Sequence, residues 1–133
     1  CIMWLTEKLE SEGKTSPKYH AVSRPDIIEA EATNRAISLS RLTKTPVLFV
    51  HISSKEAIEA IRNAQSKGFK ILAETCPQYL FLTKDKLDQK DFEGAKYVCS
   101  PPPRTKEDQL EVWKGIQNGT FDVFSSDHCP FFL

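Results

Sequence analysis

Four short apolar runs, each followed by polar side chains, constrain this chain more than any other feature of its sequence. The runs lie at residues 46–50, 70–73, 95–98 and 121–124. Continuous apolar runs of this length favour strands that are covered on both faces, as in parallel sheets. Helical patterns separate them, and strands that alternate with helices indicate βα units. The sequence therefore predicts an α/β fold.

Start and stop signals locate the helices. We predict helices at residues 4–12, from Pro25 to Leu42, from Ser53 or Ser54 to Gly68, and at 106–117. Ser53 and Glu56 have the spacing of a capping box, and Thr105 is the expected cap of the last helix. The second helix carries an apolar stripe at helical spacing, which should face the core. Its members are Ile28, Ala32, Ala36, Leu39 and Leu42.

Reactive residue types recur at the ends of these runs. One follows each run, at intervals of about 25 residues: His51, Glu74, Ser100 and Asp127. This organisation is typical of a (β/α) barrel, whose active site is built from the carboxyl ends of the strands. An open doubly wound sheet would also bind ligands at that edge. The glycine fingerprint for phosphate binding in such sheets is absent from the sequence.

Charge and composition exclude several classes of function. Lys and Arg number 18, as do Asp and Glu, so the formal net charge of the 133 residues is zero. This balance argues against nucleic acid or an anionic membrane surface as a partner. No apolar run approaches the roughly 18 residues of a membrane span, and there is no signal-peptide pattern. The first residue is Cys1, which suggests a fragment or a processed chain.

The four cysteines have no paired spacing. Cys1, Cys76, Cys99 and Cys129 form no CxxC motif and are far apart in the sequence. In a chain of this length, such usage favours a reducing compartment in which cysteine is a small hydrophobic residue. We therefore expect a cytoplasmic protein without a disulfide framework.

Two residues are candidate metal ligands. His51 ends an apolar run, so its imidazole is either a ligand at a barrel mouth or a core histidine with satisfied nitrogens. Asp127 follows the last run, where it is either a ligand and general base or a residue of a turn. A zinc site on the adjacent His128 and Cys129 is disfavoured by poor geometry.

The third candidate residue is Ser100. The three prolines that follow it stiffen the loop and hold its backbone in one orientation. This arrangement suits recognition of a ligand through main-chain groups, although a rigid turn would have the same sequence. His20 precedes a helix and lies at no strand end, so we interpret it as structural.

Five motifs then occur in order along the chain. They are YHAVSRP at 19–25, VHISS at 50–54, ETCPQYL at 74–80, GAKYVCSPP at 94–102 and SDHCPF at 126–131. Together they closely resemble the dihydropyrimidinase/hydantoinase family of cyclic amidohydrolases. The resemblance implies that residues 1–133 are part of the catalytic domain, about strands 6–8 of a (β/α)8 TIM-like barrel. The upstream strands and a small β-sandwich would be absent.

The resemblance also implies an activity. Family members open a cyclic amide, such as 5,6-dihydrouracil or a hydantoin, to an N-carbamoyl amino acid in pyrimidine catabolism. The attacking hydroxide is activated by two zinc ions, and the complete proteins usually form homotetramers. His51 matches a metal ligand, Asp127 a ligand that is also the catalytic proton shuttle, and Ser100 the residue whose main chain binds substrate. Two ligands cannot hold two ions, so the fragment alone should be inactive.

Some alternatives stay open. Either run 70–73 or run 95–98 is the strand between His51 and Asp127, and Pro103 stands where leucine is usual. Non-catalytic collapsin-response-mediator-like adaptors share the fold, although a scaffold has no need for ligand-type residues. Allantoinases and dihydroorotases share the His51 and Asp127 pattern. They typically carry histidine where this chain has Gln78 and Tyr79, which favours the dihydropyrimidinase side.

Overall fold

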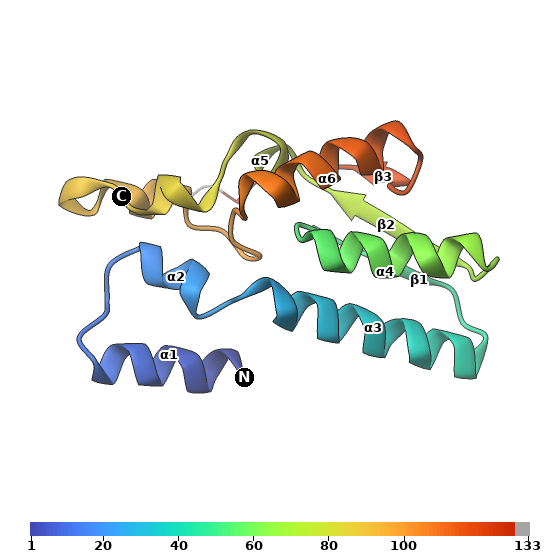
Figure 1. The fold of residues 1–133 in the computed structure, drawn as a ribbon, viewed down its shortest axis with the longest axis horizontal. Helices are drawn as coiled ribbons and strands as arrows, with labels where there is room; N and C mark the ends of the chain where they lie inside the picture. Colours follow the sequence, from blue (N-terminus) through green and yellow to red (C-terminus); the bar gives the residue numbers. More distant parts are fainter. Residues whose placement is uncertain (130–133) are drawn as a thin grey trace.

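The computed structural model describes residues 1–129, so the last two positions of the motif at 126–131 lie outside the described residues. Figure 1 shows the arrangement of the elements. In chain order they are α1 (Ile2–Ser11), α2 (Lys18–Val22), α3 (Asp26–Thr43), β1 (Val47–Phe49), α4 (Lys55–Ser66), β2 (Ile71–Thr75), α5 (Pro77–Phe81), the 3-10 helices η1 (Lys84–Leu87) and η2 (Lys90–Tyr97), α6 (Lys106–Gln117) and β3 (Val123–Phe124).

The three strands form one parallel sheet in the order β1-β2-β3. Val47 pairs with Ile71, and Glu74 pairs with Val123. Helix α4 connects β1 to β2, while α6 lies between β2 and β3 in the sequence. Helix α4 packs against both α3 and α6 (Figure 1). The α/β prediction is thus confirmed. No helix within residues 1–129 is long and apolar enough to cross a membrane.

The core lies between the sheet and its helices. Ile58 and Ile61 of α4, Val112 of α6, and Ile71 and Ala73 of β2 are almost wholly buried in one cluster. Burial of each large aliphatic side chain stabilises the fold by about 2 kcal/mol.

The opposite face of the sheet is open, contrary to the prediction of strands covered on both faces. Leu48 and Leu72 are paired neighbours in the parallel register, and they are 47% and 44% exposed. Side chains alternate between the two faces of a strand, so Leu48 and Leu72 point to the face opposite the buried core. Within residues 1–129, helices therefore cover one face only.

The predicted strand at 95–98 is wrong. Residues 95–97 belong to η2, in which Asp91 and Phe92 have φ of 53° and 66° and turn the chain sharply. A Cβ on Gly94 would lie 2.1 Å from the Leu87 carbonyl oxygen, so this packing requires glycine. β2 pairs directly with β3, which leaves no place between them. The strand between His51 and Asp127 is therefore β2, which contains the run at 70–73.

The predicted apolar face of α3 is also wrong. The buried side chains of α3 are Ala30, Thr33, Ile37 and Ser40, one step around the helix from the expected stripe. Leu39 and Leu42 are 56% and 80% exposed. Helix α4 packs against α3.

The cap predicted for α6 and the start of α4 at Ser54 are confirmed, but the capping box predicted for Ser53 and Glu56 does not form. Thr105 and Asp108 form a capping box at the start of α6. Helix α4 is capped by Ser54 without a side-chain hydrogen bond. Ser53 lies one residue before this cap, and its hydroxyl donates to Glu29 of α3 at 2.7 Å.

Candidate functional site

His51 and Asp127 follow the carboxyl ends of β1 and β3 and share an unusual backbone conformation. Their φ angles are 45° and 43°, in the left-handed region that favours glycine. For other residues this conformation costs about 1–3 kcal/mol, and such residues concentrate at functional sites. Lys44, Asp91 and Phe92 share this conformation, so φ alone does not distinguish the two predicted metal ligands from turn residues.

The end of β2 ties the two loops together. Ile52 N donates to the Glu74 carbonyl at 2.9 Å, and Ser125 N donates to the Thr75 carbonyl at 3.2 Å. The Thr75 hydroxyl donates to the Ile52 carbonyl at 2.9 Å. The residue after His51 and a residue near Asp127 are thus fixed to the same strand.

One strand separates the loops of His51 and Asp127. Two strand spacings amount to about 10 Å, so both side chains would have to converge over the end of β2 to share an ion. Within residues 1–129, no group of three or more His, Cys, Asp or Glu residues is arranged to hold a metal. The described chain therefore offers at most part of a metal centre.

Two of the three predicted site residues, Ser100 and Asp127, line one cavity of about 610 Å³. His51 does not line it. Its wall is built from α5 and the residue after it, η2, residues 98–100 and the segment after β3. The lining residues are Gln78, Leu82, Ala95, Lys96, Tyr97, Val98, Cys99, Ser100, Ser126, Asp127, His128 and Cys129. The structure thus brings Ser100 and Asp127 to one space.

Side chains from distant elements hold the loop around Ser100. Nε2 of His20 lies 2.8 Å from the Cys99 carbonyl oxygen, and the Tyr79 hydroxyl donates to the Pro101 carbonyl at 2.9 Å. The Ser100–Pro101 peptide bond is cis. Within residues 1–129, the Ser100 N–H and C=O have no hydrogen-bond partner. Both groups are therefore available to a ligand.

Burial keeps the nearby thiols and phenol protonated. Desolvation raises the pKa of Cys99 to about 11, and it also raises the pKa of Cys76 and of Tyr79. A thiol, unlike a thiolate, is a poor nucleophile. Cys99, which lines the cavity, is therefore a poor candidate for a nucleophile.

Sequence reasoning used Tyr79 only to distinguish families and gave neither Tyr79 nor His20 a link to the loop of Ser100. His20 lies in α2, 79 residues from its partner in the sequence. Nothing in linear spacing indicates a hydrogen bond from a side chain to a carbonyl over that distance. The three prolines after Ser100 were the only signal that its backbone is held.

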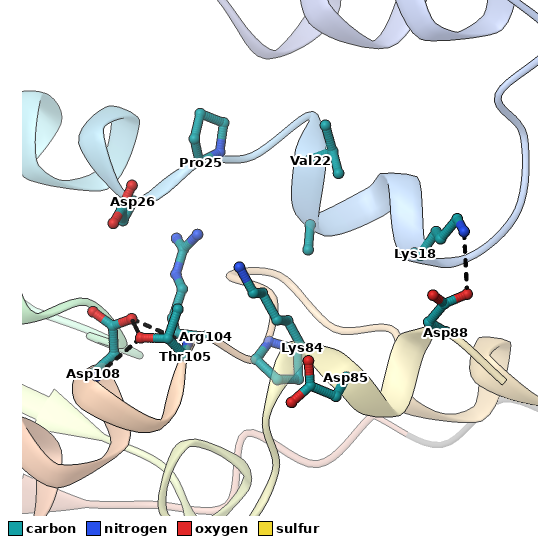
Figure 2. A pocket seen from close by; sticks show the side chains of 12 residues that line it. Lys18, Val22, Pro25, Asp26, Lys84, Asp85, Asp88, Arg104, Thr105 and Asp108 are labelled. Atoms are coloured by element: carbon teal, nitrogen blue, oxygen red, sulfur yellow. Dashed lines mark hydrogen bonds and ion pairs between the residues drawn. The ribbon is translucent and has the colours of Figure 1, made fainter.

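A second cavity, of about 440 Å³, lies between α2 and η1 (Figure 2). Three cationic and four acidic side chains line it, so their charges nearly cancel. Figure 2 shows the ion pair of Lys18 and Asp88, at 3.3 Å, at one end of this cavity and Arg104 at the other. None of the predicted site residues lines it, and its balanced charge selects no ligand.

Comparison with known proteins assigns the chain. No family model matches it. A D-hydantoinase from Rhizobium radiobacter is 50% identical over 128 residues, which are 96% of this chain and 28% of that protein. The crystal structure of dihydropyrimidinase from Brevibacillus agri superposes with a TM-score of 0.96 at 46% identity, over 98% of this chain and 28% of that one.

A relative with the opposite stereochemical name has the same fold. The L-hydantoinase (dihydropyrimidinase) from Arthrobacter aurescens has a TM-score of 0.85 at 30% identity, over 96% of this chain and 28% of its own. By sequence and by fold, the chain therefore belongs to the hydantoinase/dihydropyrimidinase family, and it spans about 28% of the length of these relatives.

Proposed function

We propose that the complete protein carrying this chain opens a cyclic amide, a dihydropyrimidine or a hydantoin, by hydrolysis to an N-carbamoyl amino acid. The observation that carries this proposal is the shared cavity of Ser100 and Asp127. It occurs in a chain 50% identical to a D-hydantoinase. The fit of Gln78 and Tyr79 to the dihydropyrimidinase side, rather than to allantoinases, supports this substrate class.

The donors present fit a zinc site in type but not in number. An imidazole from His51 and a carboxylate from Asp127 are ligands that zinc accepts, and both residues follow the carboxyl ends of strands in one sheet. We propose two zinc ions per complete subunit, with the remaining ligands outside this chain. When bound, zinc polarises a carbonyl and lowers the pKa of water.

Ser100 can bind the substrate ring through its main chain. A cyclic amide presents a C=O acceptor and an N–H donor on one edge, and the unpaired Ser100 N–H and C=O complement them. Main-chain groups in a stiff loop lose little entropy on binding.

Asp127 can carry the proton between water and the leaving nitrogen. The water oxygen forms a bond to the ring carbonyl carbon, and Asp127 accepts the proton that this oxygen loses. The carbon–nitrogen bond then breaks, and the nitrogen takes the same proton from Asp127. The carboxylate ends the cycle unchanged.

The open face of the sheet supports a larger assembly. We propose that residues 1–133 are part of a catalytic (β/α)8 barrel, whose interior would cover Leu48 and Leu72. The chain alone, with two candidate ligands, would then be inactive. For the complete protein we propose a homotetramer, as the family resemblance implies, in the cytoplasm, as the unpaired cysteine spacing indicates.

The test compares two acidic residues in the complete protein. Asp127→Asn should lower kcat on dihydrouracil or hydantoin by about 10³-fold or more, because it removes the proton acceptor. Asp88→Asn, a matched control in the other cavity, should leave kcat within about twofold. Rates on allantoin and dihydroorotate separate the sister activities.

Two outcomes contradict the proposal. Near-normal turnover in Asp127→Asn removes Asp127 from the chemistry. A wild-type protein that hydrolyses none of the four substrates and retains no zinc would be a non-catalytic adaptor.

A further inference from the structure

Two side chains form hydrogen bonds with the carbonyls that flank Ser100. His20 of α2 binds the Cys99 carbonyl through Nε2 at 2.8 Å. Tyr79 of α5 donates its hydroxyl to the Pro101 carbonyl at 2.9 Å. Neither residue lines the cavity that contains Ser100 and Asp127. Both therefore contact the residues that flank Ser100, and His20 Nε2 also lies 3.4 Å from the Ser100 hydroxyl.

The environment keeps both groups as donors. Tyr79 is 2% exposed, and burial raises the pKa of its hydroxyl, so the hydroxyl retains its proton at any physiological pH. His20 is partly buried, and desolvation lowers its pKa. A neutral imidazole next to a carbonyl oxygen must carry its proton on Nε2 to form a hydrogen bond.

These hydrogen bonds leave the main-chain N–H and C=O of Ser100 unpaired within residues 1–129. Pro101, Pro102 and Pro103 have no N–H, so none of these residues can donate to the loop's own carbonyls. Within residues 1–129, the flanking carbonyls are satisfied while the Ser100 N–H and C=O are not. Both groups can thus meet a ligand without first breaking a bond within the protein.

We propose that His20 and Tyr79 are positioning residues for substrate binding: by holding the carbonyls of Cys99 and Pro101, they aim the Ser100 N–H and C=O at the cyclic amide. This inference rests on the proposed function. It assigns the two residues a role in substrate affinity rather than in the chemical step, since neither lines the cavity that contains Asp127.

The test measures KM and kcat separately in the complete protein. Tyr79→Phe keeps the packed ring and removes only the hydroxyl, while His20→Leu removes the other donor. Each should raise KM for dihydrouracil about tenfold, the loss of one hydrogen bond, with kcat within about threefold. His20→Gln should restore KM to within about threefold, because its amide N–H can occupy the place of Nε2–H.

A matched control removes a similar bond elsewhere. Trp113 donates its indole N–H to the carbonyl of Leu80 at 3.3 Å. Leu80 follows Tyr79 in the sequence, but this hydrogen bond does not involve residues 99–101. Trp113→Phe should leave KM unchanged. An equal rise in KM in this variant would mean that general loosening of the fold, and not the orientation of the Ser100 N–H and C=O, sets the affinity. That result would overturn the proposal.

A second readout does not depend on activity. Cys99 is partly buried, its thiol donates to the Pro101 carbonyl at 3.2 Å, and its pKa is raised to about 11. Loosening the loop should therefore speed alkylation of Cys99 by iodoacetamide at least threefold or so in Tyr79→Phe and His20→Leu. The exposed Cys129 serves as internal reference.

The two readouts separate the two hypotheses. A wild-type protein without cyclic-amide hydrolysis overturns the proposed function, and the alkylation rates still decide whether the two residues hold the loop. Active variants with unchanged KM, or unchanged Cys99 alkylation in both variants, overturn the positioning role.

Discussion

At the scale of single residues, chemistry at a strand end was readable from the sequence, but contacts across the fold were not. His51 and Asp127 were predicted as reactive residues after apolar runs, and both lie after strands with left-handed φ. Ser100 was found through its prolines, although the run before it is not a strand. His20 and Tyr79 bind carbonyls far away in the sequence, and only the folded chain brings such partners together.

The environment of His20 predicts a pH-dependent stability. Burial lowers its pKa below the ordinary 6.5, outweighing the Cys99 carbonyl, and Arg24 lowers it further. As the pH falls below about 6.5, the unfolded chain binds a proton before the folded one does, so stability is lost in that range and levels off below the lowered pKa.

We therefore expect the free energy of unfolding of the complete protein to fall more steeply for wild type than for His20→Gln between pH 7 and pH 5. Urea unfolding at several pH values measures the difference. Parallel curves for the two proteins would show that His20 titrates in the folded state as it does in the unfolded chain.

At the scale of elements, patterns located helices better than they oriented them. The starts of α4 and α6 and their ends near Gly68 and Gly119 followed from caps and glycines. The buried face of α3 did not, because Thr33 and Ser40 are buried while Leu39 and Leu42 are exposed. The 95–98 run has the composition of a strand, but the direct pairing of β2 with β3 excludes it from the sheet.

A buried ion pair connects α3 to two loops, the one before α4 and the one before α6. Arg104, which precedes α6, donates to Glu29 of α3 at 2.9 Å, and the two side chains are 9% and 10% exposed. Arg104 also donates to the Ser53 hydroxyl at 3.0 Å, and Glu29 accepts from the Ser53 N–H at 2.8 Å. The pair therefore joins the loop after Ser100 to the loop after His51.

Removing one charge of this pair should be costly. Glu29→Gln leaves the Arg104 guanidinium buried without a counter-charge, so we expect a loss of about 3 kcal/mol in the free energy of unfolding. Glu31→Gln is the control on the same helix: its pair with Arg35, at 3.2 Å, is exposed, and its loss should cost less than about 1 kcal/mol. Urea unfolding of the complete protein compares them, and equal losses would contradict the argument.

At the scale of the whole molecule, the described chain has a neutral charge balance and one open sheet face. Strand composition indicated that both faces should be apolar, and both are, but only one is covered within residues 1–129. Sequence could not show which face would stay open, since alternation along β1 and β2 assigns side chains to two faces without saying which one the helices cover.

This open face predicts how the isolated chain behaves. Leu48 and Leu72 lie side by side on it, and β1 and β3 have unpaired edges in the described sheet. An exposed apolar face next to free strand edges favours association between copies. Purified alone, residues 1–133 should therefore form oligomers or aggregates in sedimentation and bind a hydrophobic dye such as ANS.

Substitution of both leucines should have opposite effects in the two contexts. Leu48→Thr with Leu72→Thr should reduce association of the isolated chain, because it replaces exposed apolar surface by hydroxyls. In the complete protein the same pair should lower stability by several kcal/mol, about 2 or more for each side chain, if a barrel interior buries this face. A complete protein that tolerates both changes without loss would mean that the face stays open there too, which contradicts the proposed barrel.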